Sequence, residues 1–162
     1  MNGKLVAGGI VAVALIVGAA VYYAQVYAFY RPIEASSPEG QVRLTAIGGG
    51  AEVIPATDFQ GIDADSSPLR FRACFTASVP PATLTGTYAA YEKPTPLIGP
   101  SWFDCFDAGT LTEDLEGGAA AAFLGQRNIK PGVDRVVAVY PDGRGFAWNQ
   151  LNGSIGDDQT IP

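Results

Sequence analysis

The chain has 162 residues, a net charge of −6, two cysteines and no histidine. The missing histidine excludes Ser-His-Asp and Cys-His nucleophile systems, histidine-bearing zinc or haem sites and phosphohistidine relays. The acidic balance without a basic stripe argues against nucleic-acid binding and against docking flat on anionic headgroups, and it is compatible with a basic partner protein.

The first predicted element is a membrane span over residues 5–30, a run of 26 residues without a charged side chain. A helix of that length is about 39 Å long and crosses a hydrocarbon core of roughly 30 Å. Pro32 disfavours helical geometry in Arg31, so residues 1–31 are expected to anchor the chain in a lipid bilayer. Aromatic side chains favour the headgroup level, and the predicted membrane-interface residues are Tyr22, Tyr23, Tyr27, Phe29 and Tyr30.

A cleaved signal peptide is the alternative interpretation, because Lys4 precedes the apolar run. Signal peptides have a shorter apolar region that ends in small residues before the cleavage site. Here the run is longer and ends in bulky rings, which favours a retained anchor.

Small residues lie on two faces of the predicted helix. Gly8, Ala12 and Ala19 fall within about 40° of one another on a helical wheel, and Ala14 with Gly18 forms another small-xxx-small pair. Small residues let a second helix approach closely in lipid. We therefore interpret these five residues as helix-docking positions for an integral membrane protein complex, although glycine and alanine are also frequent in spans without such a role.

The rest of the chain divides into three predicted parts. Residues 32–40 are polar and lack periodicity, which is typical of a linker, and residues 153–162 form a polar tail expected to be flexible. Residues 41–152 have the length and apolar patterning of one domain. Its first strand is predicted over residues 41–47 and ends at the triple glycine 48–50, which lacks the helix and the Lys-Ser/Thr of a phosphate loop.

Residues 52–67 are predicted to be a long connection. They contain Asp58, Asp63 and Asp65, but the spacing lacks the glycine and terminal glutamate of a helix-loop-helix calcium site, and turn chemistry explains these acids. The next strand is predicted over residues 69–77. Arg70 and Arg72 share a face with Cys74, where they form either an anion or partner site or an ordinary set of solvated or ion-paired arginines.

Two helices follow in the pattern. Pro81 opens the first, over residues 81–91, with Leu84, Tyr88 and Tyr91 on its buried face. Thr110 and Glu113 have capping-box spacing and predict the start of the second helix. Between the two helices we expect a short edge strand at residues 97–98, and core contacts around the cysteines from Trp102, Phe103 and Phe106.

The C-terminal part is predicted to be a β-hairpin. Residues 135–140 and 145–151 are strands joined by the turn 141–144, and residues 119–124 are ambiguous between helix and strand. The fold class is therefore α+β, with a mainly antiparallel sheet and about two helices after the N-terminal transmembrane helix.

Cys74 and Cys105 are predicted to form a disulfide, which two cysteines in an exported domain favour. Closing their separation of 31 residues stabilises a fold by about 3.5 kcal/mol in the chain-entropy model. A pair of buried cytosolic thiols is the alternative. With the disulfide, the expected location is a bacterial inner membrane with the N-terminus cytoplasmic and the domain periplasmic.

Four stretches together resemble an uncharacterised family of single-span alphaproteobacterial membrane proteins. They are the apolar run 5–30, FQGIDADSSPLRFRACF at 59–75, WFDCFD at 102–107 and DRVVAVYPDGRGFAWNQLN at 134–152. The resemblance covers nearly the whole chain, but it implies no activity and no catalytic residue. Members are sometimes labelled histidine kinases, a label that a chain without histidine does not support.

The expected function is a non-catalytic accessory subunit or assembly factor of an inner-membrane complex, respiratory or photosynthetic, with no cofactor, metal, nucleic acid or small molecule. The alternative is a carboxylate-based periplasmic enzyme or small-ligand sensor. That alternative requires two acids to converge in one cleft, and the candidate acids are Asp58, Asp63, Asp65, Asp104 and Asp107.

Overall fold

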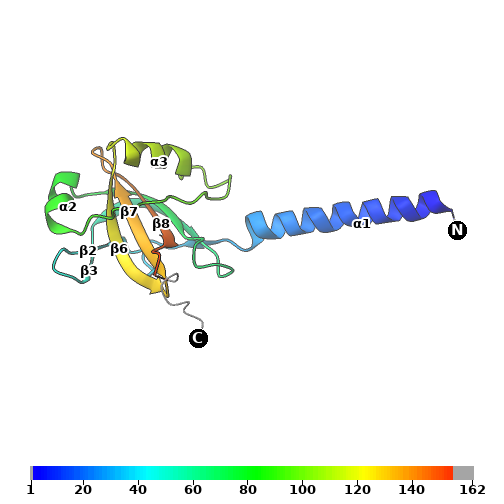
Figure 1. Cartoon of the computed structure of the whole chain (residues 1–162), viewed down its shortest axis with the longest axis horizontal. Coiled ribbons are helices and arrows are strands. Elements are labelled where there is room, and N and C mark those ends of the chain that lie inside the picture. The colour runs from blue at the N-terminus through cyan, green and yellow to red at the C-terminus, as the bar shows by residue number, and fades with distance from the viewer. Residues whose placement is uncertain (1, 155–162) are drawn as a thin grey trace, which may run out of the picture.

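The computed structural model describes residues 2–154, which form a long N-terminal helix and a domain at one end of it (Figure 1). The helix consists of α1 (Gly3–Tyr23) and a π-helical continuation, η1 (Ala24–Ala28), and neither part has a buried residue. Over Gly3–Ala28 it is long and apolar enough to cross a membrane, as the sequence predicts. It ends at Ala28, three residues before the predicted stop at Arg31.

The predicted linker over residues 32–40 is wrong at its start. β1 (Arg31–Ile33) pairs antiparallel with β4 (Ala56–Asp63), with Arg31 opposite Asp63. Only Phe29 and Tyr30 separate the helix from the sheet. Pro32 fits there because β1 is an edge strand, where the absent N–H breaks no ladder hydrogen bond. The helix is therefore joined to the sheet directly.

The domain is built on a six-stranded sheet in the order β1-β4-β5-β8-β7-β6, and every pairing is antiparallel. A separate hairpin pairs β2 with β3, and two short helices complete the domain. This confirms the predicted α+β class. The remaining elements are β2 (Arg43–Thr45), β3 (Ala51–Val53), β5 (Arg72–Ala77), α2 (Pro81–Thr87), α3 (Ala108–Glu116), β6 (Ala121–Lys130), β7 (Val133–Val139) and β8 (Arg144–Leu151).

The hairpin of β7 and β8 is confirmed. Its turn is closed by Tyr140, whose N–H donates to the Arg144 carbonyl at 2.9 Å, and Gly143 supplies a φ of +93° that favours glycine. Gly145 lies opposite Phe75 on β5, and a Cβ at this glycine would stand 2.2 Å from the Phe75 ring. The missing side chain thus makes room for the aromatic ring across the strand pair.

Several predicted elements differ from the structure. The connection predicted over residues 52–67 contains most of β3 and all of β4. The sequence did not predict β4 because a bulge between Thr57 and Gln60 breaks the alternation of inward and outward side chains. Asp58 adopts a φ of +53° in this bulge. The ambiguous stretch 119–124 becomes strand at Ala121.

The helices also differ in their limits. α2 ends at Thr87, because Tyr88 is extended and forms a β-bridge with Ala46. α3 begins at Ala108 with Asp107 as N-cap, so the predicted capping box at Thr110 is wrong. The side chain of Asp107 accepts from the N–H groups of Gly109 and Thr110, and these bonds lower the pKa of its carboxyl.

Both faces of the sheet are buried. One face packs against the β2–β3 hairpin and α2, through core residues that include Leu44, Leu84, Phe71 and Phe123. The other face packs against α3 and the segment 92–107, through Trp148, Phe103, Phe106 and Leu111 among others. Residues 97–98 in this segment are irregular, so the predicted edge strand there is wrong. We call this segment the 92–107 loop.

The predicted flexible tail falls mostly outside the described residues, which end at 154. Asn152, the residue before the predicted tail, belongs to the fold, because its side-chain amide donates to Asp134 and to Asn128, each at 2.8 Å.

Candidate functional site

The aromatic residues at the end of the N-terminal helix form a cluster with side chains of the domain, which we call the juxtamembrane collar: Tyr23, Tyr27, Tyr30, Arg70 and Trp102. The ring centroids of Tyr27 and Trp102 lie 6.2 Å apart, and Tyr30 meets Trp102 edge-on at 5.7 Å. Trp102 is 36% exposed and contacts the helix, so the prediction that it closes the core is wrong, whereas Phe103 and Phe106 are buried.

The collar also supplies hydrogen-bond donors to carbonyl groups at the end of the helix. The last carbonyls of a helix have no partner within it and need donors from elsewhere. Trp102 Nε1 donates to the Val26 carbonyl at 2.7 Å, and Arg70 Nη1 donates to the Gln25 carbonyl at 3.1 Å. A cation near a helix C-terminus also interacts favourably with the helix dipole. The domain thus caps the helix and holds it in a defined position.

Trp102 reaches the helix because the 92–107 loop is fastened to the sheet. The disulfide joins Cys74 on β5 to Cys105 in the loop, as predicted. The Gln150 side chain on β8 accepts from the Thr95 N–H at 2.7 Å and donates to the Lys93 carbonyl at 3.0 Å. Loop and sheet are therefore tied both covalently and by hydrogen bonds.

Arg72 is the third fastening of the 92–107 loop. Its side chain donates to the carbonyls of Leu97 and Ile98 in the loop, at 2.6 and 3.2 Å, and to those of Leu69 and Phe71. The residue is 3% exposed, and burial lowers the pKa of its guanidinium to about 10. The sequence predicts that Arg72 is either part of an anion or partner site or an ordinary solvated or ion-paired arginine. In the structure its guanidinium instead donates to backbone carbonyls, and we call this contact the carbonyl clamp.

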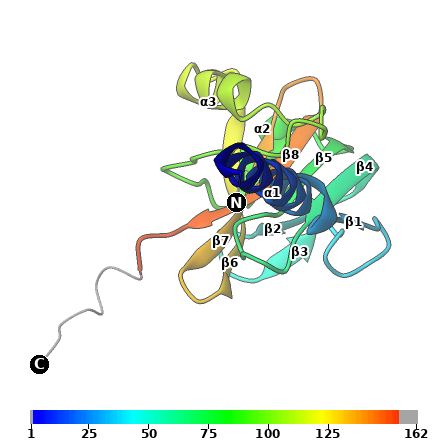
Figure 2. The ribbon, with the colours of Figure 1, turned by 90° about the vertical axis from the view of Figure 1, so that its right-hand side faces the viewer.

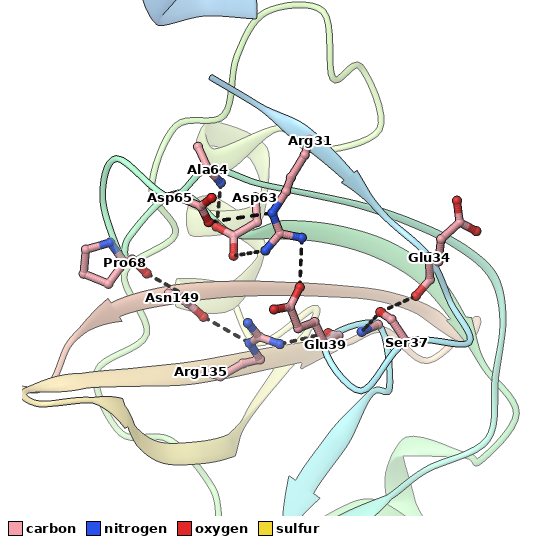
Figure 3. Close-up of polar contacts among 11 residues, drawn as sticks. Arg31, Glu34, Ser37, Glu39, Asp63, Ala64, Asp65, Pro68, Arg135 and Asn149 are labelled. Atoms are coloured by element: carbon pink, nitrogen blue, oxygen red, sulfur yellow. Dashed lines mark hydrogen bonds and ion pairs between the residues drawn. The ribbon is translucent and has the colours of Figure 1, made fainter. Parts of the chain in front are cut away.

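A second candidate lies on another part of the domain, which we call the polar groove (Figure 3). It has a volume of about 830 Å³ and is lined among others by Glu39, Asp63, Asp65, Arg135 and Asn149. Arg31 on β1 lies 2.9 Å from Glu39, 4.0 Å from Asp63 and 3.7 Å from Asp65. The structure therefore brings Asp63 and Asp65 together around one cation.

Arg135 is a groove residue that the sequence analysis missed. Its guanidinium lies 3.4 Å from the centroid of the Phe71 ring and donates to the Asn149 side chain at 3.1 Å and to the Glu39 carbonyl at 3.2 Å. Burial lowers its pKa to about 10, although Asp63 and Glu39 oppose that shift. The available signal was a pair of adjacent charged residues, Asp134 and Arg135, in a strand whose other residues are apolar.

The candidate acids do not converge as a set. Asp58 lies in the bulge of β4, and Asp104 and Asp107 lie near the start of α3. Asp63 and Asp65 alone share the polar groove, and burial raises the pKa of Asp63. Among residues 2–154 no group of three or more Cys, Asp or Glu side chains is arranged to hold a metal ion.

The predicted docking residues are spread along α1, from Gly8 toward its N-terminal end to Ala19, four residues before its end at Tyr23. The N-terminal end of α1 is the one that points away from the domain (Figure 1). A Cβ added at Gly8 or at Gly18 would meet no described atom within 4 Å. Gly8, Ala12, Ala14, Gly18 and Ala19 are all exposed. Their role in helix docking stays a prediction.

Comparison with known proteins yields one match. A model of a family of unknown function (DUF6446) matches residues 42–159, which is most of the chain and covers the domain from β2 onward, without α1 and β1. No curated protein and no solved structure matches the chain.

Proposed function

Because the chain belongs to the family of unknown function DUF6446, which supplies no activity to carry over, we propose its function from the geometry. The protein is a non-catalytic accessory subunit or assembly factor of an integral membrane complex. It binds that complex through α1 and through the domain that the helix holds at the membrane surface.

The observation that carries this proposal is the contrast between the two ends of the helix. The collar fixes its C-terminal end to the domain, whereas the residues of α1 are all exposed. An apolar helix in that state is covered by lipid or by another helix, and small residues favour the second. A rigid junction also holds the helix and the domain in one relative orientation, so that a partner contacts both at once.

The disulfide supports the proposed location. Disulfides persist in oxidising compartments, and the Cys74–Cys105 bond lies in the domain that follows the helix. We therefore place the domain on the periplasmic side of a bacterial inner membrane and the N-terminus in the cytoplasm.

The test is copurification from native membranes in mild detergent. We expect the full chain to recover a defined complex, and its composition to identify a respiratory or a photosynthetic assembly. Gly8→Leu with Ala12→Leu should reduce recovery at least tenfold, since two large side chains prevent close helix approach.

The matched control is Gly9→Leu with Ala20→Leu, which changes the same residue types on a face roughly 90° around the helix. Recovery with this control should equal that of the wild type. Isolation of a lone monomer, or equal losses with both pairs, would count against the proposal.

A carboxylate-based enzyme or small-ligand sensor is the second candidate, favoured by the meeting of Asp63 and Asp65 in the polar groove. A ligand that occupies the groove should raise the melting temperature of the wild type and leave that of Asp63→Asn with Asp65→Asn unchanged. Equal shifts in melting temperature for the wild type and the double variant would mean that the ligand binds outside the polar groove.

A further inference from the structure

We propose that a pocket at the junction of helix and domain binds the phosphate of one anionic phospholipid headgroup. The pocket, which we call the juxtamembrane pocket, has a volume of about 500 Å³. Its helix side includes Tyr22 and Gln25, and its domain side includes Arg70, Arg72 and Ile98. The inference requires α1 to lie in a bilayer and does not depend on a protein partner.

The charge of the pocket is the first argument. Two guanidinium groups line it, and in the described part of the chain neither has a carboxylate within 4 Å. Arg72 is bonded to carbonyls, which do not neutralise its charge. The described lining contains no Asp or Glu, so the cavity carries a net positive charge, although the whole chain is acidic. An anion that enters it pairs with these charges in a partly desolvated site.

Arg70 is the residue that can bind the anion directly. Among the described residues only its Nη1 has a hydrogen-bond acceptor, the Gln25 carbonyl, so Nε and Nη2 remain for a ligand. The guanidinium plane presents paired N–H donors that match two oxygens of a phosphate. Tyr30 lies under the same group, with the Arg70 Cζ 5.4 Å from its ring centroid, and limits the directions in which the side chain can turn.

The depth of the pocket in the bilayer is the second argument. The 26 residues of the helix exceed by several residues the roughly 20 that a hydrocarbon core of about 30 Å requires. The last residues of the helix, with Tyr22 and Gln25, therefore lie at the headgroup level. Figure 2, viewed along the helix, shows the domain lying behind its base. Because Tyr22 and Gln25 line the pocket, the pocket lies at the same level of the bilayer as the end of the helix.

The rim of the pocket fits that depth. Ile98, on the 92–107 loop, is 86% exposed, and Leu97 beside it is partly exposed. Apolar side chains beside a membrane helix are stabilised when they enter the membrane–water interface, because apolar surface leaves water. Trp102 on the same loop also favours that region. The loop thus carries the pocket into the layer where lipid phosphates lie, which favours a phospholipid over a soluble phosphate compound.

The test uses the full chain in detergent and native mass spectrometry. We expect the wild type to retain one phosphatidylglycerol through delipidation and to bind phosphatidylcholine at least tenfold more weakly. Arg70→Gln should lower phosphatidylglycerol binding about tenfold, and Arg70→Lys should restore part of it. Arg144→Gln is the matched control, because Arg144 lies on β8 opposite Thr76, away from the pocket, and this variant should bind like the wild type.

Equal binding by Arg70→Gln and Arg144→Gln, or equal binding of the two lipids, would overturn the proposal. Displacement of the lipid by millimolar inorganic phosphate would also overturn it, since a free anion would then be the better ligand. Circular dichroism and the intact disulfide establish that each variant is folded. If Arg70→Gln is unfolded, Ile98→Asp replaces it, and lipid binding equal to that of the wild type then contradicts the proposal.

Discussion

One face of the six-stranded sheet is covered by α2 and the β2–β3 hairpin, and the other is covered by α3 and the irregular 92–107 loop. The first cover consists of regular elements that satisfy their own backbone groups. The second is largely a loop, whose buried N–H and carbonyl groups need partners from elsewhere. Arg72 and Gln150 supply those partners, and the Cys74–Cys105 disulfide holds the loop in place.

This difference shows how a loop without secondary structure can hold a side chain, here Trp102, in a fixed position against the helix. The 92–107 loop brings Trp102 to the helix, and a loop free to move could not keep the Trp102–Val26 hydrogen bond. The regular cover has no contact of this kind with α1 or η1 among the hydrogen bonds of the described residues. Changes on the two faces should therefore affect the helix junction differently, which the following four predictions test.

The largest effect is expected from removal of the disulfide. Cys74→Ser with Cys105→Ser should lower the free energy of unfolding by about 3.5 kcal/mol, because the unfolded chain regains the entropy of a 31-residue loop. It should also loosen Trp102 from the helix. Denaturant unfolding in detergent measures the first effect, and quenching of Trp102 fluorescence by acrylamide measures the second. Unchanged quenching would mean that the disulfide does not support the junction.

Leu84→Ala tests the opposite face. Leu84 is the fully buried residue of α2, so its truncation should cost about 3 kcal/mol through lost burial and a residual cavity. Because this face is separate from the 92–107 loop, the quenching of Trp102 should equal that of the wild type. An increase in quenching would show that the two faces are coupled.

Arg72→Met tests the carbonyl clamp. The carbonyls of Leu97 and Ile98 lose their donors, which should cost about 2 kcal/mol. Hydrogen–deuterium exchange should increase over the 92–107 loop and remain unchanged in β2 and β3. Arg72→Lys keeps the charge but not the fork of donors, so it should show an intermediate increase. An increase in exchange that is confined to segments other than the 92–107 loop would contradict the role assigned to Arg72.

The smallest effect concerns Tyr140, whose hydroxyl donates to Asp114 on α3 at 2.7 Å. Tyr140→Phe should cost about 1 kcal/mol. Burial and Asp114 raise the pKa of this phenol to about 12. Because its pKa is higher in the folded state, its contribution to stability is complete below about pH 10 and is lost as the pH rises toward 12. Between pH 9 and 11 the stability of the wild type should therefore fall more steeply than that of the variant, and parallel curves would contradict this.

The candidate sites were less predictable than the fold. The aromatic residues at the end of the helix indicated the interface, but nothing in the pattern indicated that Trp102 joins them, since their contacts cross more than 70 positions of the chain. Arg135 was missed for a related reason. Its partners Asn149, Glu39 and Phe71 come from three different segments. Asp63 and Asp65 were found as acids, but their meeting around Arg31 depends on the pairing of β1 with β4.

The sequence by itself determined the N-terminal helix, the β7–β8 hairpin and the disulfide. Each of these rests on local chemistry: an uncharged run long enough for a bilayer, a turn with Asp142 and Gly143 between two apolar strands, and two cysteines without other partners. Only the tertiary structure decided that the start of the predicted linker is an edge strand, that Arg72 clamps a loop and that Trp102 caps the helix. Those outcomes depend on which backbone groups remain unpaired after folding, and no local pattern encodes that.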